Sequence, residues 1–89
     1  MKLRIGDIVI VRVSSTGEMR EVPGIVTEVD PMAADLMDRP TRANVTVFGA
    51  VDSPAFAVQN IPVCCSRNDA HRRFGHDPDA RMAWLRDPP

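Results

Sequence analysis

The chain has 89 residues, with eleven basic residues against twelve acidic ones and a formal net charge of −1. This length fits one small domain and excludes a two-domain enzyme with a cleft between its halves. The balanced charge gives no positive field for generic binding of a phosphate backbone. No run of 18 apolar residues is present to span a membrane.

Two further features of the composition bear on the core and on targeting. The aromatic residues are three Phe and one Trp, so the core must be built from Val, Ile, Ala and Met. The N-terminal segment is basic and then apolar, but Asp7 and Arg12 interrupt the apolar run. No small-residue cleavage site follows, so we expect no signal peptide.

The first predicted strand covers residues 8–13, a β-branched run of suitable length. Its isoleucines lie on one face and its valines on the other, so both faces are apolar. A strand of a small barrel normally has one face in water. The second apolar face must therefore be covered, either by the chain's own tail or by a neighbouring subunit.

The second predicted strand covers residues 20–29, after a polar turn over residues 14–18. Pro23 and Gly24 break the pattern near its start, which predicts a bulge or a sharp bend. Such a bend would let one long strand serve both halves of a barrel.

A loop and two further strands follow. Residues 30–42 form a loop that is long for a compact domain, which is typical of function or mobility, and residues 33–37 can make one helical turn. Residues 43–48 and 55–59 are the third and fourth predicted strands. A turn over residues 49–54 joins them, and residues 60–63 are interpreted as a tight turn leading out of the fourth strand.

The last third of the chain predicts two short helices. The first begins after Ser66, with Asp69 in its first turn, and ends at Gly75. The second covers residues 78–86 and places Trp84 on an apolar stripe. Helices this short are unstable alone, so both must dock on something.

Four or five short strands, with a kinked second strand and an exit turn after the fourth, predict a mainly β fold. The specific expectation is a small SH3-like barrel over residues 1–63. Residues 64–89 would form a short helical or irregular C-terminal extension, docked on the barrel or on a neighbouring subunit.

The order of motifs along residues 3–63 resembles a group of small proteins of tailed bacteriophages. Four segments carry the resemblance: a GDIV opening at 6–9, VPGIVT at 22–27, ANVTVF at 43–48 and AVQNIP at 57–62. The resemblance implies an SH3-like fold and a phage virion setting, with no assigned role. Members of the group end in a Trp-containing segment, to which Trp84 corresponds, whereas residues 64–79 have no counterpart.

Two other groups share parts of this pattern. The opening is similar to that of the ribonuclease toxins of toxin–antitoxin pairs, but this chain lacks their remaining strands and helix. Ribosome- and polymerase-associated barrels of the same shape bind RNA through basic loops, and the acidic bias of residues 1–63 argues against that use.

Cys64 and Cys65 are adjacent, and a disulfide between neighbours requires a strained ring, so we expect two reduced thiols. Neighbours in an extended segment face opposite ways, so one thiol would be buried, and an exposed one could link subunits after lysis. With His71 and His76 they invite a zinc interpretation, but the spacing does not match a zinc signature. We expect no metal and solvent-facing histidines.

The arginines of the tail suggest either a basic patch or a mixed, salt-bridged face. Aspartates are interleaved with them, so the mixed face is favoured. The residues concerned are Arg67, Arg72, Arg73, Arg81 and Arg86 with Asp69, Asp77, Asp79 and Asp87.

Trp84 is either the plug of the chain's own core or an anchor in a partner, because Trp is favoured at the centres of interfaces. The remaining interface candidates come from the tail and from the long loop. Together they are Trp84, Leu85, Met82, Arg72, Arg73, Met32, Leu36 and Met37.

Catalytic chemistry finds little support. No nucleophile motif and no phosphate-binding glycine loop is present, and Asp35 and Asp38 form a carboxylate pair without a partner acid. We therefore expect no enzyme, no cofactor and no small-molecule substrate.

The expected function is that of a structural protein of a tailed-phage virion, made in the host cytoplasm. The favoured role is a capsid-associated cement or decoration protein at junctions between major capsid subunits, with self-association. Its partners would be major capsid or connector subunits, with no membrane and no nucleic acid. The alternatives are a head–tail connector or tail component, and a small cytoplasmic module that binds RNA or protein.

Overall fold

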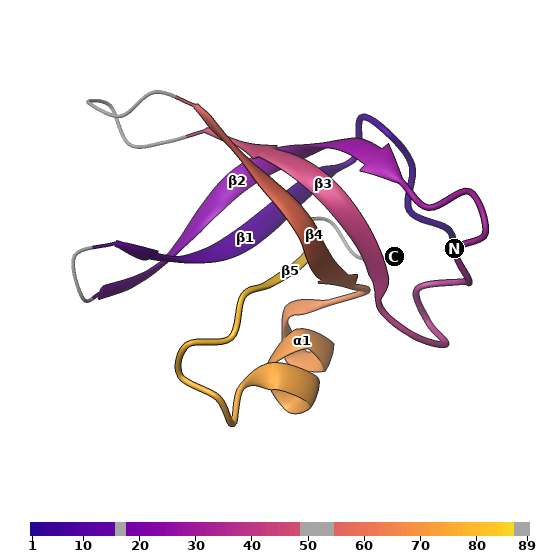
Figure 1. Cartoon of the computed structure of the whole chain (residues 1–89). Coiled ribbons are helices and arrows are strands. Elements are labelled where there is room, and N and C mark those ends of the chain that lie inside the picture. The colour runs from indigo at the N-terminus through magenta and orange to yellow at the C-terminus, as the bar shows by residue number, and fades with distance from the viewer. Residues whose placement is uncertain (16–17, 49–54, 87–89) are drawn as a thin grey trace.

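A computed structural model of the chain describes residues 1–15, 18–48 and 55–86 (Figure 1). Five strands form a closed barrel in the order β1-β2-β3-β4-β5. The elements are β1 Ile8–Ser15, β2 Glu18–Val29, β3 Thr41–Val47, β4 Phe56–Cys64, α1 Arg67–Phe74 and β5 Met82–Leu85. The mainly β class and the small five-stranded barrel with one short helix are thus confirmed.

Strand β2 serves both halves of the barrel, as predicted, but not by a bulge at Pro23 and Gly24. Its pairing with β1 runs without interruption from Glu18 to Ile25, and its register shifts only later, against β3 between Val26 and Glu28. Gly24 pairs with β1 on one edge of β2 and with β3 on the other. A Cβ added there would lie 2.7 Å from Cγ1 of Val45, so close approach of β2 and β3 requires glycine.

Strand β4 continues through residues 60–63, so the predicted exit turn is wrong. Asn60 adopts a left-handed φ of 55°, which Asn tolerates better than most residues, and the register against β3 shifts there. The Asn44 side chain holds this irregularity in place. Its Oδ1 accepts from the main-chain N–H of Asn60 at 2.9 Å, and its Nδ2 donates to Glu28 at 2.7 Å.

The helix predicted over residues 78–86 is also wrong, because residues 82–85 form strand β5. It pairs antiparallel with β1, from Val9 opposite Leu85 to Arg12 opposite Met82, and parallel with β4 at Val63 and Cys64. Pairing on both edges outweighs the helix propensity of Met, Ala and Leu. The barrel therefore does not end at residue 63, and its closing strand comes from the segment expected to be an extension.

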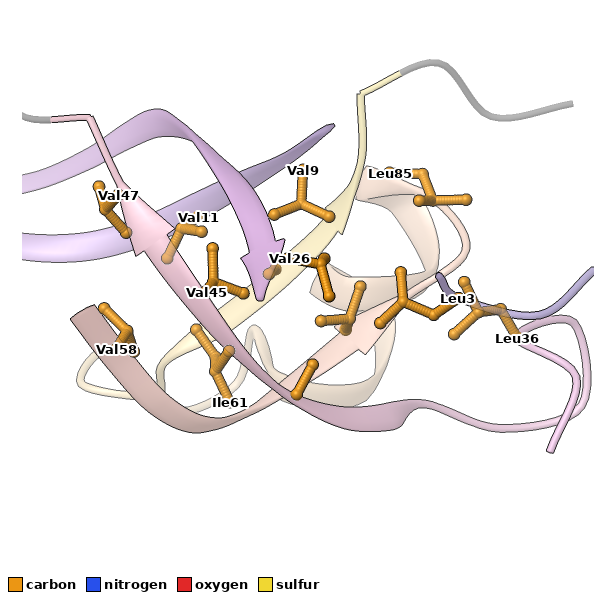
Figure 2. Close-up of a cluster of buried hydrophobic side chains, with 13 residues drawn as sticks. Leu3, Val9, Val11, Val26, Leu36, Val45, Val47, Val58, Ile61 and Leu85 are labelled. Atoms are coloured by element: carbon orange, nitrogen blue, oxygen red, sulfur yellow. The ribbon is translucent and has the colours of Figure 1, made fainter. Parts of the chain in front are cut away.

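The interior of the barrel is filled mainly by valines (Figure 2). Val9, Val11, Val45, Val47 and Val63 have no exposed surface. Leu3 and Leu36 close one end, and Val47 and Val58 lie toward the other (Figure 2). A core with no aromatic ring inside the barrel agrees with the composition.

Helix α1 forms where it was predicted and covers an outer face of the barrel. Ser66 accepts from the main-chain N–H of Asp69 at 3.2 Å as the N-cap, and Gly75 is the C-cap. A second apolar cluster lies beneath the helix, formed by Cys64, Ala70, Met82 and Trp84 with Ile10, Phe74 and Ala80 against it. The chain's own tail therefore covers the Ile10 side of β1.

The long loop between β2 and β3 is tied to the N-terminal segment. Leu36 is fully buried, and its main-chain N–H donates to the carbonyl oxygen of Met1 at 2.8 Å. The carboxylate of Asp35 binds the Met1 ammonium group and the main-chain N–H of Met37. The helical turn predicted over residues 33–37 does not form there: the N–H of Ala33 donates to the Asp30 carbonyl oxygen, and the N–H groups of Asp38 and Arg39 donate to the Asp35 carbonyl oxygen. Of the turn predicted over residues 14–18, residues 14–15 and 18 belong to β1 and β2, and residues 16–17 lie outside the described residues. The turn predicted over 49–54 and Asp87 also lie outside them.

Candidate interaction surfaces

Four of the predicted interface residues belong to the interior of the chain. Met82 and Leu36 have no exposed surface, Trp84 is 4% exposed and Leu85 is 7% exposed. Leu85 and Leu36 fill the barrel, whereas Met82 and Trp84 lie under α1. Of the two possibilities for Trp84, the structure therefore shows the plug of the chain's own core.

Polar side chains of α1 surround the Trp84 ring. The Arg67 Cζ atom lies 5.9 Å from the ring centroid, within cation–π range, and the His71 ring centroid lies 5.6 Å away. Arg67 also donates twice to the Glu21 carboxylate on β2, at 3.0 Å each. The hydrogen bond from Arg67 lowers the pKa of Glu21 below its usual range. This bidentate pair joins the tail to the opposite hairpin.

The predicted mixed face on α1 centres on Asp69, which is only 8% exposed. Arg72 donates to it at 2.6 Å and Arg73 at 3.1 Å. Burial raises the pKa of Asp69, but the hydrogen bonds and charges of the two arginines lower it by more, so the net shift is downward. Arg72 and Arg73, which were predicted as interface residues, therefore form ion pairs with Asp69 of the same helix.

The expectation of solvent-facing histidines holds for one of the two. His76 is exposed, whereas His71 is half-buried beside Trp84, and its Nε2 has no hydrogen-bond partner in the described part of the chain. The difference arises because the face of α1 that bears His71 packs on β5. Across residues 1–15, 18–48 and 55–86, no group of three or more His, Cys, Asp or Glu side chains is placed to hold a metal ion.

Both cysteines are free thiols in different environments. Cys64 has no exposed surface, and burial raises the pKa of its thiol to about 12. Cys65 is half-buried and packs against the barrel core. If either thiol links subunits, it is Cys65.

Exposed apolar side chains gather at the two ends of the barrel. The loop end, defined here as Ile5, Met32 and Met37, has exposed fractions of 70%, 83% and 64%. The hairpin end, defined here as Met19, Phe48 and Phe56, has fractions of 37%, 47% and 45%. These two ends lie on opposite sides of the barrel, since the 30–40 loop is at one end and the start of β2, the end of β3 and the start of β4 are at the other (Figure 1).

The sequence identified Met32 and Met37 but missed Ile5 and the three residues of the hairpin end. One signal was available for Phe48: Val45 and Val47 point into the core, so Phe48 must point away from it. Phe56 shares a strand face with the buried Val58, but it lies at the open mouth of the barrel. The alternation of apolar and polar residues shows which face of a strand a side chain occupies. It does not show whether that part of the strand lies inside the barrel or at its end.

Comparison with protein families, curated proteins and solved structures found no match to this chain. Within the described residues, no helix is long and apolar enough to cross a membrane.

Replacement of Asp69 tests the salt-bridged face. We expect Asp69→Asn to lower the free energy of unfolding at pH 7 by about 1–3 kcal/mol, because two arginines lose a charged acceptor. The pKa of Asp69 is lowered on folding, so its contribution is present above the usual value of 3.8 and is lost as pH falls through the folded value.

The difference between the wild type and Asp69→Asn in urea denaturation should therefore shrink as pH is lowered from about 5 to about 2. Asp79→Asn, at an exposed position, is the matched control and should change little. A difference that is constant with pH would contradict the role assigned to the carboxylate.

Thiol labelling tests the assignment of the cysteines. In the native state at pH 8, iodoacetamide should modify Cys65 and leave Cys64 unmodified, because the Cys64 thiol is buried and un-ionised. Cys65→Ser should then take up no label until denaturant is added, whereas Cys64→Ser should label natively, as measured by intact mass. Rapid native labelling of Cys65→Ser would show that the β4 end is open.

Proposed function

We propose that the chain is a structural, non-catalytic protein of a tailed-phage virion. Its role is that of a capsid-associated cement or decoration protein, which binds at junctions between major capsid subunits. It is made in the host cytoplasm and acts in the assembled particle.

The order of motifs supports the virion setting. The GDIV opening leads into β1, and the segments at 22–27, 43–48 and 57–62 lie on or next to β2, β3 and β4. Each segment that carries the resemblance therefore belongs to the barrel framework, in the order that the phage group shows.

The observation that carries the cementing role is the pair of apolar ends. A protein that stabilises a junction must contact at least two neighbours, and this barrel exposes large apolar side chains at its loop end and at its hairpin end. Apolar surface of this kind marks sites of association. Many copies with weak contacts on two sides would bind strongly together, because each first contact raises the effective concentration of the second.

Particle composition tests this proposal. Mass spectrometry of purified particles of the encoding phage should detect the chain, at a copy number comparable with that of the major capsid protein. A copy number near that of a single portal ring would instead assign it to the head–tail connector. Absence from particles would refute the virion role.

Surface variants test the two-ended contact. Met32→Ser and Phe56→Ser, one at each end, should each reduce incorporation into particles several-fold, whereas Gln59→Ala, an exposed change outside both ends, should not. All three should unfold at nearly the wild-type temperature as isolated chains. Normal incorporation of both serine variants would contradict the two-ended contact.

A further inference from the structure

The barrel is closed over only part of its length. Strand β5 pairs with β1 from Val9 to Arg12 and with β4 at Val63 and Cys64. Beyond these pairs, the end of β1 and the first residues of β4 each keep one edge without a neighbouring strand among the described residues. Figure 1 shows the β1–β2 pair and the β3–β4 pair diverging on this side.

A groove of about 220 Å³ lies between these free edges. Its apolar lining comes from β1, β2 and β4, and residues before β5 form its rim. The lining residues are Val11, Arg12, Val13, Met19, Phe56, Ala57, Val58, Asp79 and Arg81. Val11 and Val58 are core residues, so the groove opens directly onto the barrel interior.

Main-chain groups of β4 point into this groove. The N–H of Phe48 donates to Pro23 of β2 at 3.0 Å, so by alternation Val47 directs its main-chain groups toward β4. Val47 lies opposite Phe56, and Phe56 therefore faces β3. The N–H and C=O groups of the next residue, Ala57, and of Gln59 then point to the free edge.

The edge of β4 lacks the protection that the free edge of β2 has. The part of β2 that does not pair with β3 carries Glu18, Arg20 and Glu21, and charged residues of this kind discourage strand addition. From Phe56 to Gln59, β4 has no charged residue and no proline. An edge of this kind is a template for pairing with another strand.

The charged residues at the rim of the groove favour a ligand with an acidic side chain. Arg81 is exposed and makes no ion pair within the described part of the chain, and Arg12 donates to the carbonyl oxygen of Pro78 at 3.0 Å. With Asp79 as the single acidic residue of the lining, the groove carries an excess of one positive charge. An acidic side chain next to Arg81 would complement it.

We propose that this groove binds an extended segment of a neighbouring protein, which adds as a strand to the free edge of β4. The segment directs alternate apolar side chains toward Val11 and Val58 and places an acidic side chain at Arg81. Strand addition at this groove would be one of the contacts of the proposed virion role. Only the identity of the neighbouring protein rests on that proposed function.

The test selects ligands from a library of random peptides of about ten residues, panned against the purified full chain. Enriched peptides should alternate apolar residues and carry Asp or Glu, and their binding is then measured by fluorescence anisotropy. Ala57→Pro removes an N–H that points to the free edge of β4 and that pairs with no strand in the described part of the chain. This variant should therefore fold and bind at least tenfold more weakly. Gln59→Ala, which keeps the main chain, should bind as the wild type does.

Arg81→Glu provides a second readout, should Ala57→Pro fail to fold. It should weaken binding of the acidic peptides several-fold and strengthen binding of the same peptides with Lys in place of the acid. Selection of no peptide, or binding unchanged in folded Ala57→Pro and in Arg81→Glu, would overturn the proposal. Because this experiment uses no particles, its failure would leave the particle composition result standing, and the reverse also holds.

Discussion

The whole fold depends on four residues near the C-terminus that join the two ends of an otherwise open sheet. Strand β5 pairs with β1 on one edge and with β4 on the other. Its side chains alternate between two cores: Ala83 and Leu85 enter the barrel, whereas Met82 and Trp84 enter the cluster under α1. One short strand thus closes the barrel and attaches the helix to it.

This arrangement explains how a domain of 89 residues forms a core with only four aromatic residues in its sequence. Valines fill most of the barrel interior, and the single Trp covers the outside of β1 and β5. The bidentate contact between Arg67 and Glu21 then connects the helix to the far hairpin. The aromatics that remain exposed, Phe48 and Phe56, are those available for association.

Local sequence predicted most of the elements but not the closure. Strands β1 to β3 and helix α1 follow from β-branched runs and from the Ser66 cap, which are local signals. Residues 82–85 have helical propensity, and only their pairing with two distant strands makes them a strand. Residues 60–63 have the Asn and Pro that are typical of a turn, yet the ladder with β3 continues beyond Asn60, which takes up the irregularity with a left-handed φ.

The same reasoning explains the mixed result for the candidate surfaces. Burial of Leu36 depends on its contact with the N-terminal segment, which no pattern within the loop reveals. Exposure of Phe56 depends on how far β5 extends along the barrel. Whether a residue at the end of a small barrel is buried or exposed depends on where the strands close the barrel, and closure depends on contacts between residues far apart in the sequence.

Trp84 is the single tryptophan of the chain, so its fluorescence reports on how β5, the closing strand, packs beneath α1. At concentrations where the chain sediments as a monomer, we predict that the Trp84 emission of the folded protein is blue-shifted. In urea, the loss of this emission should coincide with the loss of the far-ultraviolet circular dichroism signal of the barrel, in one transition with one midpoint. Emission typical of water-exposed tryptophan in the folded monomer, or a fluorescence transition well below that of the barrel, would contradict the account. It would mean that the tail does not close the barrel.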